Sequence, residues 1–223
     1  IYWGVKYQPS RKYSFLAYYD KFSFPWLRFG VDAPSHGAEW LSRFTYRPTR
    51  EITLFAQVRE EGKEVSLDGE NLSNLVQRVR RNYLFDIEYE VNKNFSIRTR
   101  LQSSNQNMGG VFSSGYALIQ DAGYRMGKFR LNARIALFET DNFDNRQYVY
   151  ERDVLYAFSI PAYNGTGIRN YLLLRYSASR KLDIWFRYAR FSYRDRDAVG
   201  SGLEESNGPF RTEIKWMMRW KID

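Results

Sequence analysis

Apolar and polar residues alternate one by one over most of this chain, and this period of two constrains the fold more than any other feature. In residues 84–101, LFDIEYEVNKNFSIRTRL, Phe85 and Ile87 share one parity and Asp86 and Glu88 the other. Successive side chains of a strand point to opposite faces, so such a segment predicts a β-strand with one apolar and one polar face. No long stretch keeps helical spacing. Eleven strands are predicted, at residues 2–8, 13–22, 38–47, 51–59, 75–91, 95–102, 114–126, 129–138, 168–178, 182–193 and 209–222.

The connections predict an antiparallel up-and-down meander. Short connections with turn-forming residues are expected at 9–12, 48–50, 92–94, 127–128 and 179–181. Long polar connections are expected at 23–37, 60–74, 103–113, 139–167 and 194–208. The two lengths alternate strictly, which places every short turn at one end of the sheet. This asymmetry is typical of outer-membrane barrels, whose short turns are periplasmic.

The size of the side chains on the apolar face of the strands indicates which face lies inside a barrel. On the last strand the apolar face carries Trp216, Met218 and Trp220, which would overcrowd the interior of a small closed barrel but suit a band that faces lipid. A soluble β-sandwich or a lipocalin-like barrel with charged outer ladders is the alternative. The sequence favours an all-β transmembrane β-barrel. The predicted lipid-facing or girdle residues are Trp26, Phe85, Tyr89, Phe186, Tyr188, Trp216 and Trp220.

The opposite parity is predicted to line a wet lumen, because Arg or Lys at the bilayer midplane would cost about 2 to 4 kcal/mol each. A three-residue turn at 92–94 sets Asp86 opposite Arg100, Glu88 opposite Arg98 and Glu90 opposite Ser96; other turns set Asp121 opposite Arg134 and Arg175 beside Asp183. Each pair contributes about 0 to 1 kcal/mol, and together they specify register. The predicted lumen ladder is Asp86, Glu88, Glu90, Arg98, Arg100, Asp121, Arg134, Arg175, Asp183, Arg187, Arg211, Glu213, Lys215 and Arg219.

The strand count predicts that the barrel is larger than this segment. Residues 1–223 are expected to form a single domain, because the composition, with 43% hydrophobic, 18% aromatic and 26% charged residues, suggests one all-β unit. Single-chain bacterial barrels usually have an even number of strands, and a barrel must close without a free edge. The segment is therefore expected to be the C-terminal portion of a barrel whose remaining strands lie upstream. Residues 139–167 are expected to form a long external loop or a plug, because counting 148–163 as a strand would break the alternation of connections.

No catalytic, metal or cofactor site is predicted. The only histidine, His36, follows Ser35 directly, so an outer-membrane hydrolase using Ser35 and His36 is an alternative, but no nucleophile motif surrounds them. The acidic stretch 139–145 offers oxygen donors for calcium without the spacing of an EF-hand. The chain has no cysteine, which excludes thiolate chemistry and disulfides.

The chain is strongly basic, with a formal net charge of +9. This charge suits an anionic partner such as lipopolysaccharide or nucleic acid. Arg78, Arg80 and Arg81 form a basic run. Arg78 and Arg80 share the parity of Asp86 and Glu88 and are expected to line the lumen; the alternative is an electropositive vestibule that attracts anions or a nucleic-acid strand.

Four stretches resemble the C-terminal β-barrel region of Bacteroidetes outer-membrane helix-hairpin-helix domain proteins. They are DKFSFPWLRFGVDAPSHG at 20–37, LFETDNFDNRQYVYERDVLYAFSIPAYNGTG at 137–167, VGSGLEESNG at 199–208 and TEIKWMMRWKI at 212–222; residues 24–35 and 153–165 are the most specific. The resemblance spans the whole chain and implies that helix-hairpin-helix repeats lie far upstream. No such repeat is present here, so a DNA-binding role is not transferred to any residue of this chain.

The sequence therefore predicts a non-enzymatic barrel of the bacterial outer membrane with its C-terminus in the periplasm. Its expected role is a pore for small solutes or a component of an envelope assembly, in contact with outer-membrane lipid, lipopolysaccharide and other envelope proteins. The alternative is a nucleic-acid uptake or binding protein that uses the upstream repeats.

Overall fold

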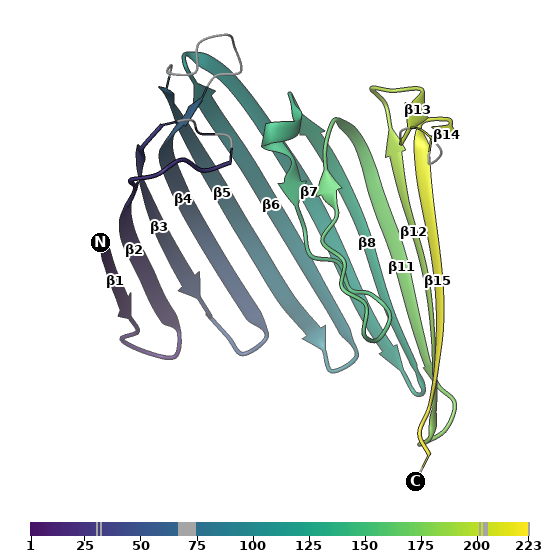
Figure 1. Cartoon of the computed structure of the whole chain (residues 1–223). Coiled ribbons are helices and arrows are strands. Elements are labelled where there is room, and N and C mark those ends of the chain that lie inside the picture. Colours follow the sequence, from purple (N-terminus) through teal and green to yellow (C-terminus); the bar gives the residue numbers. More distant parts are fainter. Residues whose placement is uncertain (30, 32, 67–74, 201, 203–204, 223) are drawn as a thin grey trace.

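Eleven long strands form one antiparallel sheet in chain order (Figure 1). The computed structural model describes residues 1–29, 31, 33–66, 75–200, 202 and 205–222. The prediction of an all-β up-and-down fold with eleven strands is confirmed. The strands are β1 (Tyr2–Tyr7), β2 (Tyr13–Phe24), β3 (Ser35–Tyr46), β4 (Ile52–Ser66), β5 (Leu75–Asn92), β6 (Phe95–Met108), β7 (Val111–Met126), β8 (Phe129–Thr140), β11 (Thr166–Ser177), β12 (Leu182–Tyr193) and β15 (Phe210–Trp220).

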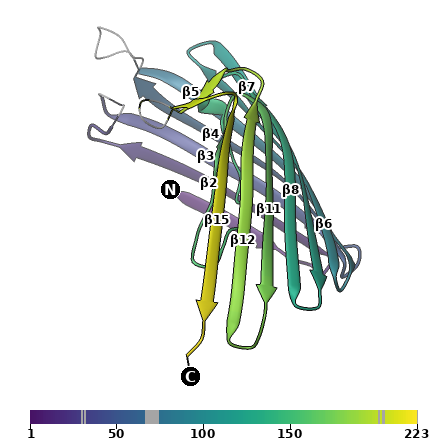
Figure 2. The same ribbon diagram turned by 90° about the vertical axis from the view of Figure 1, so that its right-hand side faces the viewer.

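The sheet is bent into an open trough, which Figures 1 and 2 show from two sides. β1 and β15 are the two ends of the strand order, and in the described part of the chain they pair only with β2 and β12. A barrel wall has no free edge once it is closed. Among the described residues no helix has the length and apolar character needed to cross a bilayer.

The strand register agrees with the register predicted from the turns. Asp86 lies opposite Arg100, Glu88 opposite Arg98, and Glu90 opposite Ser96. The hairpin of β7 and β8 likewise sets Asp121 opposite Arg134, and that of β11 and β12 sets Arg175 opposite Trp185. The tight turns therefore fix the pairing, and with it which side chains share a face.

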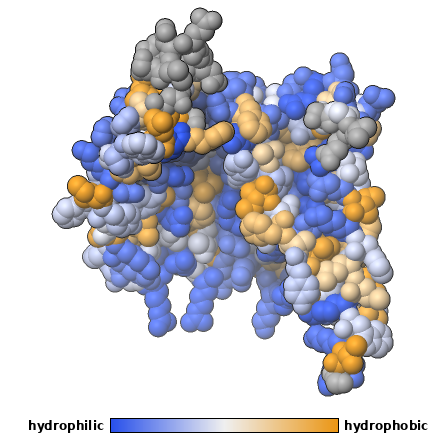
Figure 3. Space-filling view, viewed as in Figure 1, coloured by the Kyte–Doolittle hydropathy of each residue, from blue (hydrophilic) through white to orange (hydrophobic). Residues whose placement is uncertain are grey.

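The convex face of the sheet carries the large exposed apolar side chains. Phe186 is 40% exposed and lies opposite Trp216, which is 65% exposed. Phe85, Tyr89 and Trp220 are also exposed, whereas Tyr188, on the same face, is half-buried. Trp26 lies just beyond the end of β2 and is exposed. The side chains of the charged ladder occupy the concave face, where Figure 3 shows mainly hydrophilic residues.

One predicted long connection is wrong. Residues 103–113 were expected to form a loop, but β6 continues to Met108 and β7 begins at Val111, joined by Gly109 and Gly110 alone. Both glycines have positive φ, +58° and +89°, which is the backbone of a tight hairpin turn. The Ser, Asn and Gln residues that suggested a loop still pair in the backbone ladder. The strict alternation of short and long connections is therefore broken here.

Two further predicted loops have one wrong boundary each: the loop predicted at 60–74 begins too early, and the loop predicted at 23–37 ends too late. β4 extends to Ser66, so residues 60–66 are strand; residues 67–74 of the same predicted loop lie outside the described residues. Ser35 and His36 were expected in a loop but open β3, paired with Phe24 and Ser23. Polar strand ends that project beyond an apolar band lack the alternation from which strands were predicted.

Candidate functional site

The most distinctive element is a segment that folds into the trough. Residues 141–165, here called the inner loop, connect β8 to β11 within the stretch predicted as an external loop or plug. The inner loop contains the short helix η1 (Phe143–Asn145) and a small hairpin of β9 (Gln147–Tyr148) and β10 (Ala162–Tyr163). In Figure 1 it is the green segment that lies across β6, β7 and β8.

Apolar packing seats the inner loop on the sheet. Val149 and Tyr163 of the loop are fully buried against Ala117, Ile119 and Ala136 of the strands and against two phenylalanines, Phe138 and Phe191. The ring centroids of Tyr163 and Phe138 are 5.3 Å apart. Gly115 permits the closest approach, because a Cβ there would lie 2.6 Å from the carbonyl oxygen of Asn145. The loop and the strands thus form a dry contact inside the trough.

A buried ionic centre lies beside this contact. Glu151 of the inner loop accepts two hydrogen bonds from Arg169, at 2.9 and 2.8 Å, and one from the hydroxyl of Tyr163 at 3.0 Å. It also pairs with Arg187. The side chains of Glu151, Arg169 and Arg187 have no exposed surface. Because buried ions are tolerated only when they are paired and hydrogen-bonded, this geometry holds the loop in one place.

Two other residues of the predicted ladder also bind the inner loop. Lys215 of β15 lies 2.6 Å from Asp153 of the loop. Arg134 pairs with Asp121 at 2.6 Å and donates to the carbonyl oxygen of Tyr150 at 2.8 Å. Glu213 contacts the two wall arginines that hold Glu151, Arg169 at 3.6 Å and Arg187 at 3.5 Å. Part of the ladder, namely Arg134, Arg187 and Lys215, thus belongs to the docking surface of the loop.

The remaining ladder residues lie on the same face without touching the inner loop through any described ion pair. Asp86 receives both Arg98 and Arg100, at 2.9 and 2.7 Å, so Arg98 reaches the diagonal carboxylate and not Glu88 opposite. Asp183 pairs with Arg175 and with Arg219. Glu88, Glu90 and Arg211 share this parity and are exposed.

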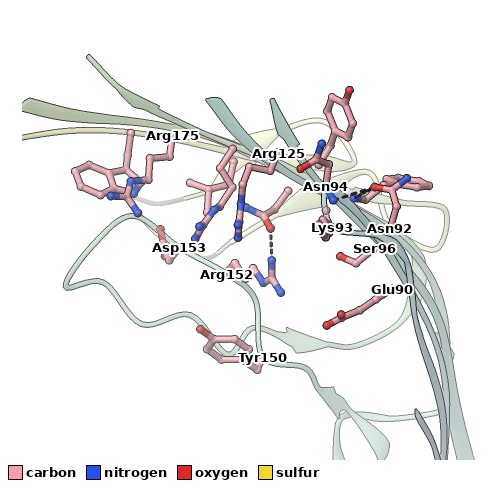
Figure 4. Close-up of a pocket in the computed structure, with 17 residues that line it drawn as sticks. Glu90, Asn92, Lys93, Asn94, Ser96, Arg125, Tyr150, Arg152, Asp153 and Arg175 are labelled. Carbon is pink, nitrogen blue, oxygen red and sulfur yellow. Dashed lines mark hydrogen bonds between the residues drawn. The ribbon is translucent and has the colours of Figure 1, made fainter. Parts of the chain in front are cut away.

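A cavity of about 620 Å³ lies beside the inner loop at the short-turn end of the trough (Figure 4). Arg125, Arg130 and Arg175 reach it from the wall, and Arg152 and Asp153 reach it from the inner loop. The cavity is polar and open to solvent, as expected of a surface that water or a dissolved solute wets.

Sequence reasoning missed the residues that anchor the loop. Glu151, Tyr163 and Arg169 were not predicted as site residues, although a signal was present. At 116–119 and 133–138, apolar residues occupy both parities of strands that otherwise alternate, and Ala117, Ile119, Ala136 and Phe138 are the inward ones that the loop covers.

The hydrolase and calcium alternatives lack the geometry that they require. Ser35 is buried and His36 exposed, as neighbours in a strand point to opposite faces. Asp141 accepts from the backbone N–H and the hydroxyl of Ser114, at 2.7 and 3.0 Å. Within the described residues, no three His, Asp or Glu side chains are grouped so that they would hold a metal ion.

The fold and its two faces define a class of protein. An antiparallel meander with an exposed apolar convex face and a polar concave face has the construction of a transmembrane β-barrel wall.

Comparison with known proteins gives only distant structural likenesses. No family model and no curated protein matches the chain. Among solved structures, the chain is similar to the copper transporter OprC, with 11% identity and a TM-score of 0.48 over 92% of this chain and 37% of that one. It is also similar to the toluene transporter TodX of Pseudomonas putida, with 8% identity and a TM-score of 0.41 over 100% of this chain and 73% of that one.

Proposed function

We propose that this chain forms part of the wall of a bacterial outer-membrane β-barrel that conducts small solutes, with the inner loop narrowing the lumen. The observation that carries the proposal is the contrast between the two faces: Phe186 and Trp216 are exposed on one, whereas Arg169 and Arg187 are buried on the other. In water such an apolar surface would be an aggregation site, and in lipid it is the expected exterior.

The length of the strands supports a membrane position toward the short-turn end. A spanning strand needs about 9 to 11 residues, whereas β5 has 18 and β7 has 16. The surplus lies toward the long-loop end, where an ion pair of Glu60 and Arg81 appears on the otherwise apolar face. We place the long-loop end outside the cell, near lipopolysaccharide, and the short turns with the C-terminus in the periplasm.

We propose that further strands, from an upstream part of the same protein, pair with the open edges of β1 and β15. β1 is exposed along its whole length, and unpaired N–H and C=O groups are costly in lipid. Closure by additional strands would satisfy both edges. As a structural component of an envelope assembly, the barrel would contact other envelope proteins.

Planar-bilayer recording on the full-length protein tests the pore. Folded, heat-modifiable protein is expected to produce discrete conductance steps. Release of the inner loop by Glu151→Gln is expected to enlarge or destabilise these steps, because the loop occupies part of the trough. Folded protein that inserts but never conducts would reject the pore and leave the role of a structural component of an envelope assembly.

A further inference from the structure

We infer that the cavity at the short-turn end of the trough binds the oxyanion group, carboxylate or phosphate, of a small solute. The inference rests on the proposed pore and assigns it a substrate class. Figure 4 shows guanidinium groups approaching the cavity from both sides: Arg125 and Arg175 from the wall, and Arg152 from the inner loop.

A row of like charges crosses three neighbouring strands at this place. Arg130 of β8 lies directly opposite Arg125 of β7 and directly opposite Arg175 of β11. Like charges in facing positions of a sheet destabilise it. The row of arginines therefore lowers the stability of the folded protein unless a group of opposite charge lies near it.

The protein itself does not supply that opposite charge to the middle of the row. Within the described part of the chain, no acidic side chain forms an ion pair with the guanidinium group of Arg125 or of Arg130. Arg175 has Asp183 at 3.0 Å, and Arg152 donates to the neutral side chain of Asn132. The carboxylate of Asp153 is held by Lys215.

The lining of the cavity is cationic as a whole. Its charged side chains are those of Lys93, Arg125, Arg130, Arg152 and Arg175 against those of Glu90 and Asp153. Gly123, on the inward face of β7, lies between Ser96 and Arg152; a Cβ there would lie 2.8 Å from the hydroxyl oxygen of Ser96. Guanidinium groups bind carboxylate and phosphate with parallel N–H donors, so several of them around one cavity fit an oxyanion better than chloride.

Because the arginine row lies on the concave face, the anion that it binds would come from a dissolved solute and not from a lipid headgroup. The row lies on the concave face, opposite in parity to Tyr124, Phe129 and Leu174, which face outward around a separate apolar hollow. An anion at the row would therefore be reached through the trough. The inner loop, through Arg152, would contribute to the site as well as narrow the path to it.

The test uses the full-length protein in bilayers of zwitterionic lipid, with inorganic phosphate as the probe. The wild type is expected to prefer anions in a potassium chloride gradient, and added phosphate is expected to reduce the chloride current. The double variant Arg125→Gln, Arg130→Gln should lose this preference by about threefold or more, because the local potential is what concentrates anions. Arg125→Lys, Arg130→Lys keeps the charge and should retain anion preference but lose much of the block by phosphate.

A matched control removes the same charge elsewhere. Arg11→Gln, Arg50→Gln alters two exposed arginines in short turns at the same end of the sheet and should leave both selectivity and block unchanged. A wild type that prefers cations, or a phosphate block that survives the Arg125 and Arg130 replacements, would overturn the site.

Equilibrium dialysis of phosphate against the detergent-folded protein separates this inference from the pore. Binding that the double variant loses, in a protein that does not conduct, would uphold the oxyanion site and reject the pore. Conductance without arginine-dependent binding would uphold the pore and reject the site.

Discussion

The two halves of the trough have the same strand pattern but different interiors. From β7 to β12 the inner loop covers the concave face, and buried residues recur at every second position of β8, β11 and β12. From β1 to β4 the concave face is uncovered, and only Ser35 and Leu41 are buried within those strands. Alternation in the sequence therefore sets which face a side chain occupies, whereas the inner loop decides whether that face is dry.

Ion pairs between glutamate and arginine differ in burial, and therefore in their expected contribution to stability, between the two halves. Glu151 in the covered half binds two arginines that have no exposed surface. Glu39 in the uncovered half binds Arg59 in a pair that water still reaches, with side-chain exposures of 16% for Glu39 and 42% for Arg59. An exposed ion pair contributes about 0 to 1 kcal/mol, whereas removing one member of a buried pair costs about 3 to 5 kcal/mol, because the remaining charge is left unpaired.

The largest expected effect comes from Glu151→Gln. The amide cannot neutralise Arg169 and Arg187, so the free energy of unfolding should fall by about 3 to 5 kcal/mol, or the inner loop should detach. Urea unfolding in detergent micelles measures the first outcome, and faster hydrogen exchange at residues 145–163 measures the second. Glu39→Gln is the control and should cost about 0 to 1 kcal/mol. Equal effects of the two variants would show that the ion pairs of the covered half contribute no more to stability than the pair in the uncovered half.

β5 borders the uncovered half and allows the two faces of the sheet to be compared at neighbouring residues. Phe85→Arg places a cation on the apolar convex face of β5 and should cost about 2 to 4 kcal/mol if the residue lies near the bilayer midplane. Leu84→Arg places the same cation on the concave face and should be close to neutral. Refolding yields and unfolding midpoints in lipid vesicles measure the difference. If Leu84→Arg were the more harmful variant, lipid would not contact the convex face.

The strands and their register were predictable because both depend on local signals. Alternation located all eleven strands, and the turn at 92–94 fixed Asp86 opposite Arg100. The tight turn at Gly109 and Gly110 was missed because polar residues surround it, and Ser35 and His36 were misplaced for the same reason. In both places the strand continues past the apolar band, where one face no longer differs from the other.

The site was less predictable than the fold because it depends on contacts between distant segments. Arg134 and Arg187 were placed on the correct face, but their partners in the inner loop were not identified, since Tyr150 and Glu151 belong to a stretch with no period. Inward apolar residues such as Ile119 and Phe138 were the sequence feature that indicated that another segment packs on the concave face of β7 and β8.

A smaller effect is expected from Gly115→Ala, which tests how closely the inner loop lies on the wall. The new methyl group would meet the Asn145 carbonyl oxygen at 2.6 Å and Thr140 at 2.9 Å, and overpacking of this kind costs about 1 to 3 kcal/mol. Gly62→Ala is the control in the uncovered half, where the nearest atom would be 3.8 Å away. Unfolding midpoints in detergent should fall only for Gly115→Ala, and a neutral result there would mean that the loop is readily displaced.

The smallest effect concerns an ion pair outside the covered surface, in the connection that follows β12. Arg196 lies 2.8 Å from Asp195, and its hydrogen bond holds the pKa of the Asp195 carboxyl below the ordinary value. A lowered folded-state pKa stabilises the protein above the unfolded-state pKa, about 3.9, and this contribution is lost as the pH falls through the folded-state value. Asp195→Asn should therefore cost less than about 1 kcal/mol at pH 7 and nothing once the carboxyl of the wild type is protonated. Urea midpoints of the two proteins should converge as the pH is lowered. A gap that stayed unchanged down to acid pH would show that packing in the connection after β12, and not the charge of Asp195, separates them.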